Sequence, residues 1–359
     1  MFNFTDLKQL HLEITNNCQA SCPMCGRNCH GLENPNLKLN GWTLSDYKNI
    51  ITQDVINQVN AIYFCGNYGD PLLSNDLIDM IRYTVEAKPG IDLRVHTNGS
   101  LRSKAWWKEL AETLPEEHAV IFAIDGLQDT HSIYRIGTSF DKVIENAKAF
   151  IDAGGRAKWA YIRFKHNEHQ VDEARQMAKD LGFIEFSLKD SSRWLMEPRF
   201  PVLNKDQSVN YYLEPSQYSE IKIIDKNVIN NHEEILKNTE IDCYAQHMRE
   251  AYIDCYGNVF PCCWLALIPY QPPDRYTAIK EIRGKIENEY NDLVSSLGGI
   301  DALNAINRSL QDIINSQEYQ TVWEKYWGEK KLITCARTCG KMKELFSTPK
   351  DQFVETENL

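Results

Sequence analysis

The sequence predicts an α/β protein in which helices flank a parallel sheet of six strands and a smaller domain follows. Short runs of β-forming residues alternate with amphipathic stretches over residues 7–186, which is the pattern of repeated βα units. The 359 residues suffice for one large domain and a smaller one, because a single core rarely grows past about 250 to 300 residues. We therefore expect a two-part molecule.

The six expected strands alternate with helices that have clear apolar faces. Trp106 and Trp107 begin one such helix after Ser103, a candidate N-cap, and we expect one tryptophan to pack inward and the other to lie on the helix flank. Six βα units are two fewer than a closed eight-fold barrel needs, and the turns that carry ligands should meet at the C-terminal ends of the strands. The expected strands are residues 10–14, 61–64, 91–96, 119–124, 159–164 and 183–188.

Three cysteines, Cys18, Cys22 and Cys25, follow the first expected strand in the spacing C-x3-C-x2-C. Three thiolates on one loop can hold three corners of an iron-sulfur cube and leave one iron without a protein ligand. Zinc is the alternative, with Cys29 or His30 as a fourth ligand, because paired cysteines are common in structural zinc sites. The x3 gap followed by x2 is less usual for zinc, so the spacing favours an iron-sulfur cluster.

Glycine-rich and polar turns follow the second and third expected strands. After the second, glycines let the backbone approach a ligand and Asp70 offers an anionic acceptor. After the third, Thr97 and Asn98 can bond ribose or carboxylate oxygens, whereas His96 is expected to be an ordinary strand-end residue. A plain βα turn is the alternative for the first of these segments. The candidate ligand contacts here are Gly66, Asn67, Gly69, Asp70, Thr97 and Asn98.

Polar residues also follow the fourth and fifth expected strands. Asp125 is a candidate contact to a ribose or substrate and Arg135 a candidate contact to a carboxylate, with a surface salt bridge as the alternative. After the fifth strand, His166 and Asn167 are candidate ligand contacts. His166 and His169 have no third partner in register, so we do not expect them to bind a metal.

A second set of cysteines lies in the C-terminal part of the chain. Gly257-Asn258 between β-forming residues predicts a tight hairpin that delivers Cys262. Cys243 precedes the hairpin, and Cys335 and Cys339 come much later. A structural zinc site is the alternative to a second cluster.

Together these motifs resemble those of the radical S-adenosylmethionine (SAM) superfamily. The resemblance rests on the C-x3-C-x2-C loop after strand one, the Gly-Asn-Tyr-Gly-Asp-Pro turn after strand two and Thr-Asn-Gly after strand three. It implies a partial (β/α)6 TIM barrel, a 4Fe-4S cluster whose open iron binds SAM, and reductive cleavage of SAM to a 5′-deoxyadenosyl radical. The turn departs from the family's Gly-Gly-Glu-Pro by the insertion of Asn67-Tyr68 and by Asp70 in place of Glu. Backbone contacts to SAM from residues 66–69 are therefore better founded than a contact from the Asp70 carboxylate.

The spacing from Cys243 through Gly257 to Cys262 resembles the SPASM and twitch extensions of this family. Too few cysteines remain for two further clusters, so the resemblance implies a twitch-like α+β domain with one auxiliary 4Fe-4S cluster. Its ligands would be Cys243, Cys262, Cys335 and Cys339, with Cys255 or Cys263 as substitutes because the x3 gap between the last two departs from the usual x2.

The resemblance implies hydrogen-atom abstraction from a substrate and a reductase or flavodoxin-type electron donor. The first strand begins close to Met1, which favours oxidation of a small sugar-like or aminocyclitol-like molecule over a ribosomal peptide. A peptide-modifying maturase remains the alternative, and a molybdopterin-type cyclase resembles the auxiliary hairpin less well. A non-catalytic binding protein stabilised by zinc is the alternative from another class.

Composition and segment boundaries complete these expectations. The formal net charge of −11 argues against binding nucleic-acid phosphates. Eleven cysteines without a secretory signal or a long apolar run predict a soluble cytoplasmic protein without membrane contact. We expect a barrel over residues 1–195, a bridging segment over 196–241, the auxiliary domain over 242–346 and a frayed tail over 347–359. Residues 300–326 are expected to form one amphipathic helix.

Overall fold

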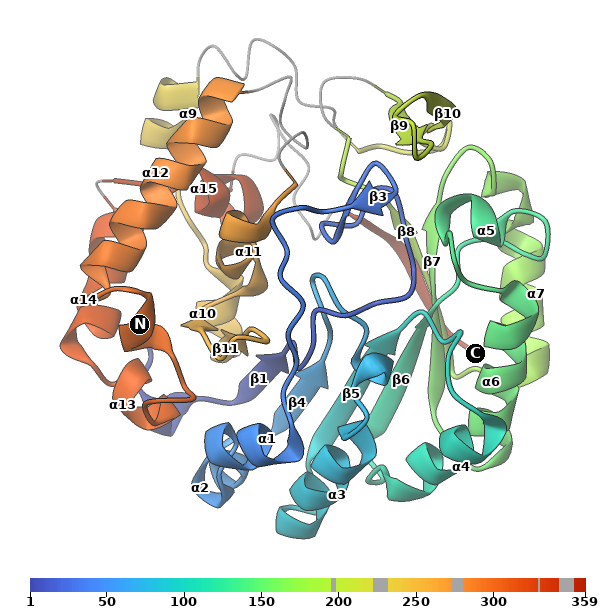
Figure 1. Cartoon of the computed structure of the whole chain (residues 1–359), viewed down its shortest axis with the longest axis horizontal. Coiled ribbons are helices and arrows are strands. Elements are labelled where there is room, and N and C mark those ends of the chain that lie inside the picture. The colour runs from blue at the N-terminus through green and yellow to red at the C-terminus, as the bar shows by residue number, and fades with distance from the viewer. Residues whose placement is uncertain (195–197, 222–231, 273–279, 329, 342–351) are drawn as a thin grey trace.

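A computed structural model describes residues 1–194, 198–221, 232–272, 280–328, 330–341 and 352–359. Its centre is a nine-stranded sheet in the order β12-β11-β1-β4-β5-β6-β7-β8-β13, which curves so that the helices between the barrel strands lie on the convex side (Figure 1). Among the described residues, no helix has the length and apolar character needed to cross a membrane.

Six adjacent strands, all parallel, form the barrel part of the sheet, which confirms the predicted partial barrel. Each pairs with the next in chain order, for example Ala61 of β4 with Asp92 of β5. Their side chains alternate between the helix-covered face and the concave face. The strands are β1 (Gln9–Leu12), β4 (Ala61–Phe64), β5 (Asp92–Thr97), β6 (His118–Ala123), β7 (Ala157–Arg163) and β8 (Glu185–Asp190).

The helices between these strands bury their apolar faces on the convex side of the sheet. In α4, the Ser103 hydroxyl accepts a bond from the Trp106 N–H, Trp107 is fully buried and Trp106 is only partly buried, as predicted. The helices are α1 (Leu44–Ile50), α2 (Gln53–Gln58), α3 (Leu77–Ala87), α4 (Lys104–Thr113), α5 (His131–Tyr134), α6 (Phe140–Asp152) and α7 (Val171–Leu181). Shorter elements are η1 (Phe4–Asp6), β2 (Asn28–Cys29), β3 (Leu32–Glu33), η2 (Pro71–Leu73) and η3 (Glu168–Gln170).

The C-terminal part of the chain joins the same sheet. Strands β11 (Glu250–Ile253) and β12 (Val259–Phe260) form the predicted hairpin, with Gly257 at φ +87° in its turn. Strand β11 then pairs in parallel with β1, so the expected second domain is continuous with the barrel sheet (Figure 1). Its helices are α10 (Tyr244–Met248), α11 (Cys263–Ala266), η4 (Ile268–Tyr270), α12 (Lys280–Ser296) and α15 (Ile333–Cys339).

The single helix expected over residues 300–326 is wrong. The structure has η6 (Ile300–Leu303), α13 (Leu310–Ile314) and α14 (Gln317–Trp327). Ser309 and Ser316 start new helices, because their hydroxyls accept bonds from the N–H groups three residues later. Most of the expected apolar stripe is buried, but Ile306 is 45% exposed.

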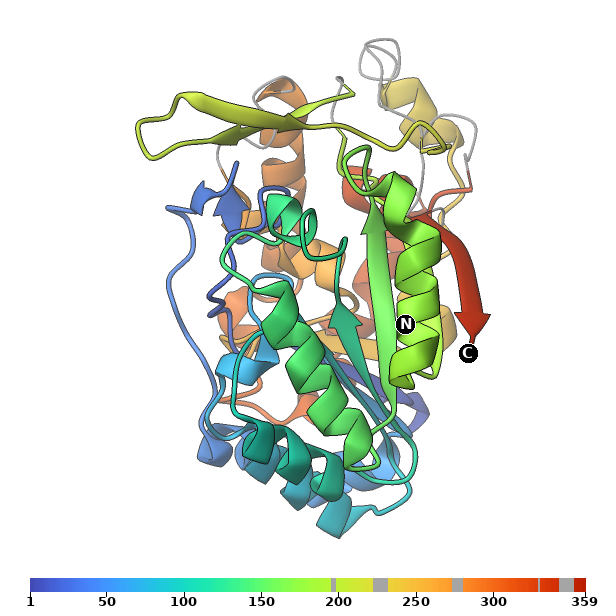
Figure 2. The same ribbon diagram turned by 90° about the vertical axis from the view of Figure 1, so that its right-hand side faces the viewer.

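Two further segments differ from expectation. The tail expected to be frayed contains β13 (Phe353–Asn358), which pairs antiparallel with β8 and places Glu355 and Glu357 against Arg175. The bridging segment contains the two-stranded sheet of β9 (Phe200–Leu203) and β10 (Val209–Leu213), followed by α9 (His232–Asn238). Figure 2 shows this hairpin across the top of the molecule, above the C-terminal ends of the barrel strands. The boundaries expected at residues 195 and 346 lie outside the described residues.

Candidate active site

The loop after β1 carries Cys18, Cys22 and Cys25 to the mouth of the partial barrel. Hydrogen-bond donors are directed at two of their sulfurs. The Ala20 N–H lies 3.4 Å from the Cys18 Sγ, and the Arg135 Nη1 lies 3.9 Å from the Cys22 Sγ. Burial raises the pKa of Cys22 to about 11, although Arg135 opposes the rise. A bound metal would remove these thiol protons, and donors near the sulfurs would then stabilise the resulting thiolates.

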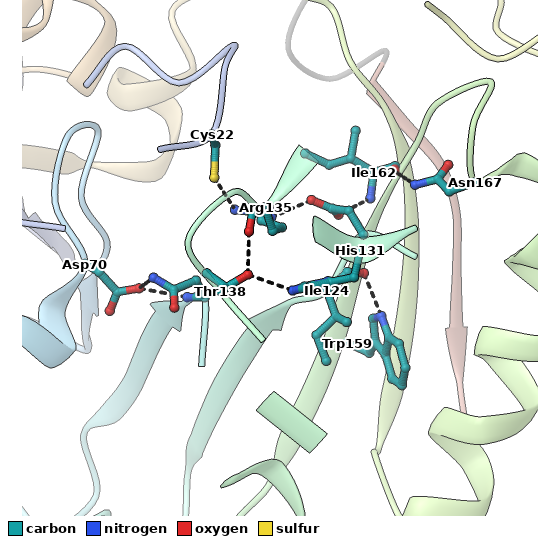
Figure 3. Close-up of polar contacts among 11 residues, drawn as sticks. Cys22, Asp70, Ile124, His131, Arg135, Thr138, Trp159, Ile162 and Asn167 are labelled. Atoms are coloured by element: carbon teal, nitrogen blue, oxygen red, sulfur yellow. Dashed lines mark hydrogen bonds and ion pairs between the residues drawn. The ribbon is translucent and has the colours of Figure 1, made fainter. Parts of the chain in front are cut away.

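Arg135 forms a buried ion pair with Asp125. Figure 3 shows Arg135 below Cys22 and directed at its sulfur. The Arg135 Nε lies 2.6 Å from one Asp125 oxygen, and the Ile162 N–H donates to the other at 2.6 Å. Burial raises the pKa of Asp125, and the Arg135 charge counteracts that rise. The pair is therefore not the surface salt bridge considered as an alternative, because Asp125 has no exposed surface. The carboxylate that Arg135 contacts in this structure is that of Asp125.

The predicted turn residues Asp70, Thr97 and Asn98 converge on one another. The buried Asp70 carboxylate accepts bonds from the Thr97 hydroxyl at 2.9 Å and from the Asn98 N–H and Nδ2 at 2.8 and 2.6 Å. Asn98 also approaches the Cys18 Sγ at 3.7 Å through Nδ2. Asp70 thus holds the end of β5 beside the cysteine loop. Because its carboxylate already accepts these bonds, the backbone of residues 66–69 is the better candidate surface for SAM.

Glu13 is a site residue that the sequence interpretation missed. Its Oε1 accepts the N–H groups of Tyr68 and Gly69 at 2.7 and 3.1 Å, and its Oε2 accepts the hydroxyl of Tyr252. Burial raises its pKa to about 7, although the three hydrogen bonds favour the charged form and lower the pKa. The available signal was a carboxylate within the apolar alternation of strand one, directly before the cysteine loop.

Gln19 was missed as well, and no strand or spacing pattern points to it. Its Nε2 donates at 2.8 Å to both the Asn98 Oδ1 and the Ser100 hydroxyl. It therefore joins the cysteine loop to the turn after β5.

Of the two candidates after β7, Asn167 belongs to the turn itself. Its Oδ1 accepts the Phe164 N–H at 2.7 Å, its Nδ2 donates to the Ile162 carbonyl at 3.0 Å, and it has no exposed surface. The predicted contact between Asn167 and SAM is therefore replaced by a structural role. His166 stacks on Phe164 with ring centroids 5.3 Å apart. Burial lowers the pKa of His166 to about 4.

Four C-terminal cysteines lie around one small cavity beside the barrel. The Asp242 N–H donates to the Cys339 carbonyl at 2.9 Å, which joins the loop of Cys243 to the end of α15. Cys255 does not line this cavity and is buried in the hairpin turn. Within the described residues, no three His, Cys, Asp or Glu side chains lie close enough together to hold a single metal ion. The cysteines that line the cavity are Cys243, Cys262, Cys335 and Cys339.

The concave face of the sheet borders a larger cavity of about 560 Å³, here called the lumen. Tyr63 and His96 face it from neighbouring strands, with the Tyr63 hydroxyl 2.5 Å from the His96 Nδ1. Lys189 of β8 also lines it. The cysteines on its wall are Cys243, Cys262, Cys263 and Cys339.

Residues 12–183 match the radical SAM superfamily. A tungsten-containing aldehyde ferredoxin oxidoreductase cofactor-modifying protein of Pyrococcus furiosus is 29% identical over 131 residues, which are 36% of this chain and 34% of that relative. The match therefore spans about a third of the curated relative.

Solved structures support the same fold. Streptococcus suis SuiB bound to S-adenosylmethionine superposes with a TM-score of 0.55 at 13% identity, over 90% of this chain and 68% of SuiB. The anSMEcpe structure with bound AdoMet gives a TM-score of 0.51 at 16% identity, over 88% of this chain and 79% of that protein.

A partial barrel with three cysteines at its mouth is typical of SAM-dependent iron-sulfur proteins. The region that matches the radical SAM superfamily contains the cysteine loop and every candidate SAM contact. The family's cofactors are a 4Fe-4S cluster and SAM. The residues present fit that cluster, because three thiols share one loop and N–H donors face two of them.

Proposed function

We propose that this protein cleaves SAM reductively and uses the resulting 5′-deoxyadenosyl radical to take a hydrogen atom from a small-molecule substrate. The observation that carries the proposal is the gathering of Cys18, Cys22 and Cys25 at the strand ends, with Asp70 and Arg135 ordered around them. Cofactors of this kind supply the difficult chemistry, while the protein supplies orientation and exclusion of water.

The chain's own residues would divide that work. Cys18, Cys22 and Cys25 hold three irons and leave the fourth for SAM. The backbone of residues 66–69 would bind the SAM amino group, and Glu13 holds this backbone in place through bonds from the Tyr68 and Gly69 N–H groups. Arg135 stabilises the thiolate of Cys22 and fixes Asp125 at the barrel mouth.

The size of the lumen supports a small-molecule substrate. Its volume of about 560 Å³ lies within the roughly 300 to 1,000 Å³ typical of small-molecule sites. Since three of the four proposed auxiliary ligands border it, a substrate there would lie beside the proposed auxiliary 4Fe-4S cluster. That cluster would accept the electron that remains after hydrogen abstraction. We place the reaction among oxidations for this reason.

A peptide substrate is the second candidate. SuiB has been solved bound to the precursor peptide SuiA, and that structure superposes on this chain with a TM-score of 0.53 at 15% identity. A screen of candidate substrates for deuterium transfer into 5′-deoxyadenosine separates the two classes. Transfer from a deuterated peptide and from no small molecule would overturn the small-molecule proposal.

The cleavage proposal is tested with anaerobically purified protein, dithionite and SAM. We expect 5′-deoxyadenosine from the wild type and from Cys335→Ala, and none from Cys22→Ala, because only Cys22 belongs to the SAM cluster site. Iron and sulfide analysis should give about eight irons per chain in the wild type, as two cubes require. Two zincs without sulfide, or equal cleavage by both variants, would contradict the proposal.

A further inference from the structure

The turn after β4 lies between the two cysteine sets. On one side, the Asn67 carbonyl lies 3.8 Å from the Cys25 Sγ, and the Asp70 N–H donates to the Asn17 carbonyl at 2.9 Å. These contacts join the turn to the loop that carries the first cysteine set. The turn is closely packed there, because a Cβ on Gly69 would lie 1.8 Å from the Thr15 carbonyl oxygen.

On its other side, the same turn contacts the segment that follows Cys262. The Asn67 Nδ2 donates to the Cys263 carbonyl at 3.1 Å, and the Tyr68 hydroxyl donates to the Leu267 carbonyl at 2.6 Å. Cys262 is the N-cap of α11 and Leu267 is its C-cap. Two consecutive side chains of the turn therefore bond to carbonyls at both ends of this short helix.

Further contacts make this connection specific. The Asn67 Nδ2 also lies 3.3 Å from the hydroxyl of Tyr252, which in turn donates to Glu13. The Tyr68 ring packs edge-on against Tyr270 at 6.0 Å between centroids, and Tyr68 is 5% exposed. Asn67 and Tyr68 are the two residues inserted into this turn relative to the family's four-residue pattern.

We propose that Asn67 and Tyr68 are positioning residues that couple the SAM site to the auxiliary cysteine site. SAM bound against the backbone of residues 66–69 orders this turn, and the two side chains transmit that order to α11 and thus to Cys262. The proposal rests on the proposed function, since it requires that SAM bind at this turn. The coupling is reciprocal by linkage. If bound SAM changes the affinity of the auxiliary site for its ligand by some factor, occupancy of the auxiliary site changes the affinity for SAM by the same factor.

Hydrogen–deuterium exchange of the iron-loaded full chain, with and without SAM, tests the coupling. The N–H of Leu267 donates to the Cys263 carbonyl, the same carbonyl that Asn67 contacts, so it reports on α11 directly. In the wild type we expect SAM to slow exchange in residues 65–70 and in residues 263–267. Asn67→Ala and Tyr68→Phe should keep the first effect and lose the second. Asn67→Ala removes the bonds to the Cys263 carbonyl and the Tyr252 hydroxyl, and Tyr68→Phe removes the bond to the Leu267 carbonyl. We expect exchange in residues 263–267 to change by about fivefold.

Asn75→Ala is the matched control, because Asn75 accepts an exposed bond from Arg102 at 3.3 Å and has no such bond to any described residue of the C-terminal part. Iron content and the urea midpoint show that each variant is folded and loaded, and Tyr68→Phe provides the test if Asn67→Ala does not fold. Protection of residues 65–70 without any change in 263–267, or equal changes in all variants, would overturn the coupling alone. No SAM-dependent protection at residues 65–70 in the wild type would overturn the proposed function and the coupling with it.

Discussion

Glu13 has 1% of its surface exposed, yet it accepts hydrogen bonds from Tyr68, Gly69 and Tyr252. Burial of a carboxylate disfavours its charged form, whereas hydrogen bonds to it favour that form. Burial dominates here, because the pKa is raised to about 7. The turn is therefore held by a carboxyl group that gains or loses its proton near neutral pH.

The pKa of Glu13 predicts a pH-dependent contribution to stability. The folded state binds this proton more tightly than the unfolded state, with a pKa of about 7 against 4.5. The free energy of unfolding should therefore fall as pH rises from about 4.5 to 7, by about 3 kcal/mol from this residue. Glu13→Gln removes that contribution, so the variant should gain stability relative to the wild type between pH 5 and 8 in urea unfolding. If the free energy of unfolding of the wild type and of Glu13→Gln changed with pH in the same way, the raised pKa of Glu13 would be contradicted.

Arg135 is the counter-charge of a carboxylate that has no contact with water. Arg135→Met should leave Asp125 charged and without a cation, at a cost of about 3 to 5 kcal/mol in the free energy of unfolding. Arg135→Lys retains the charge and should cost less. Urea unfolding of the double variant Arg135→Met/Asp125→Asn provides the control, since removing the stranded charge should restore part of the loss. A double variant no more stable than Arg135→Met would contradict this explanation.

At the scale of elements, the turn after β4 has little space for an added side chain. Gly69→Ala would place a Cβ 1.8 Å from the Thr15 carbonyl oxygen, so the turn and the cysteine loop would have to separate. We expect SAM binding to be lost and the protein to be destabilised. Gly90→Ala is the control, because its Cβ would meet nothing within 4 Å and should change stability by less than about 0.5 kcal/mol. Equilibrium SAM binding and urea unfolding measure both effects, and unchanged SAM binding in Gly69→Ala would contradict the close approach.

The barrel strands were predictable because buried parallel strands form apolar runs, whereas other elements gave weaker signals. Strand β13 was missed because all its residues are exposed, and its place depends on pairing with β8, distant in sequence. The break between α13 and α14 depends on Ser316 as an N-cap inside an otherwise helical pattern. Asn167 was assigned to a ligand because polar residues at strand ends look alike in sequence, whether they bond a ligand or their own turn.

On the scale of the whole molecule, the two predicted domains share one sheet. Strand β11 is the neighbour of β1, and their pairing runs from Gln9–Glu250 to Leu12–Ile253. An unpaired edge of a sheet invites association with other chains. A fragment ending at residue 195 leaves that edge of β1 bare, so the boundary expected there does not isolate a self-sufficient unit.

We predict that the fragment of residues 1–195 is aggregation-prone and less stable than the full chain. A fragment of residues 1–272, which restores β11 and β12, should recover much of the soluble yield. Sedimentation and urea unfolding measure the difference. A monomeric 1–195 fragment with the midpoint of the full chain would show that β11 contributes nothing to the sheet.

The pairing of β1 with β11 also affects the timing of synthesis. Gln9 and Glu250 are 241 residues apart, so at about 5 to 20 residues per second the ribosome delivers β11 roughly 10 to 50 s after β1. During that interval the loop with Cys18, Cys22 and Cys25 has emerged, while the strand that secures its base has not. A nascent chain therefore offers these thiols to iron-delivery factors, or to oxidants, before the sheet around them is complete.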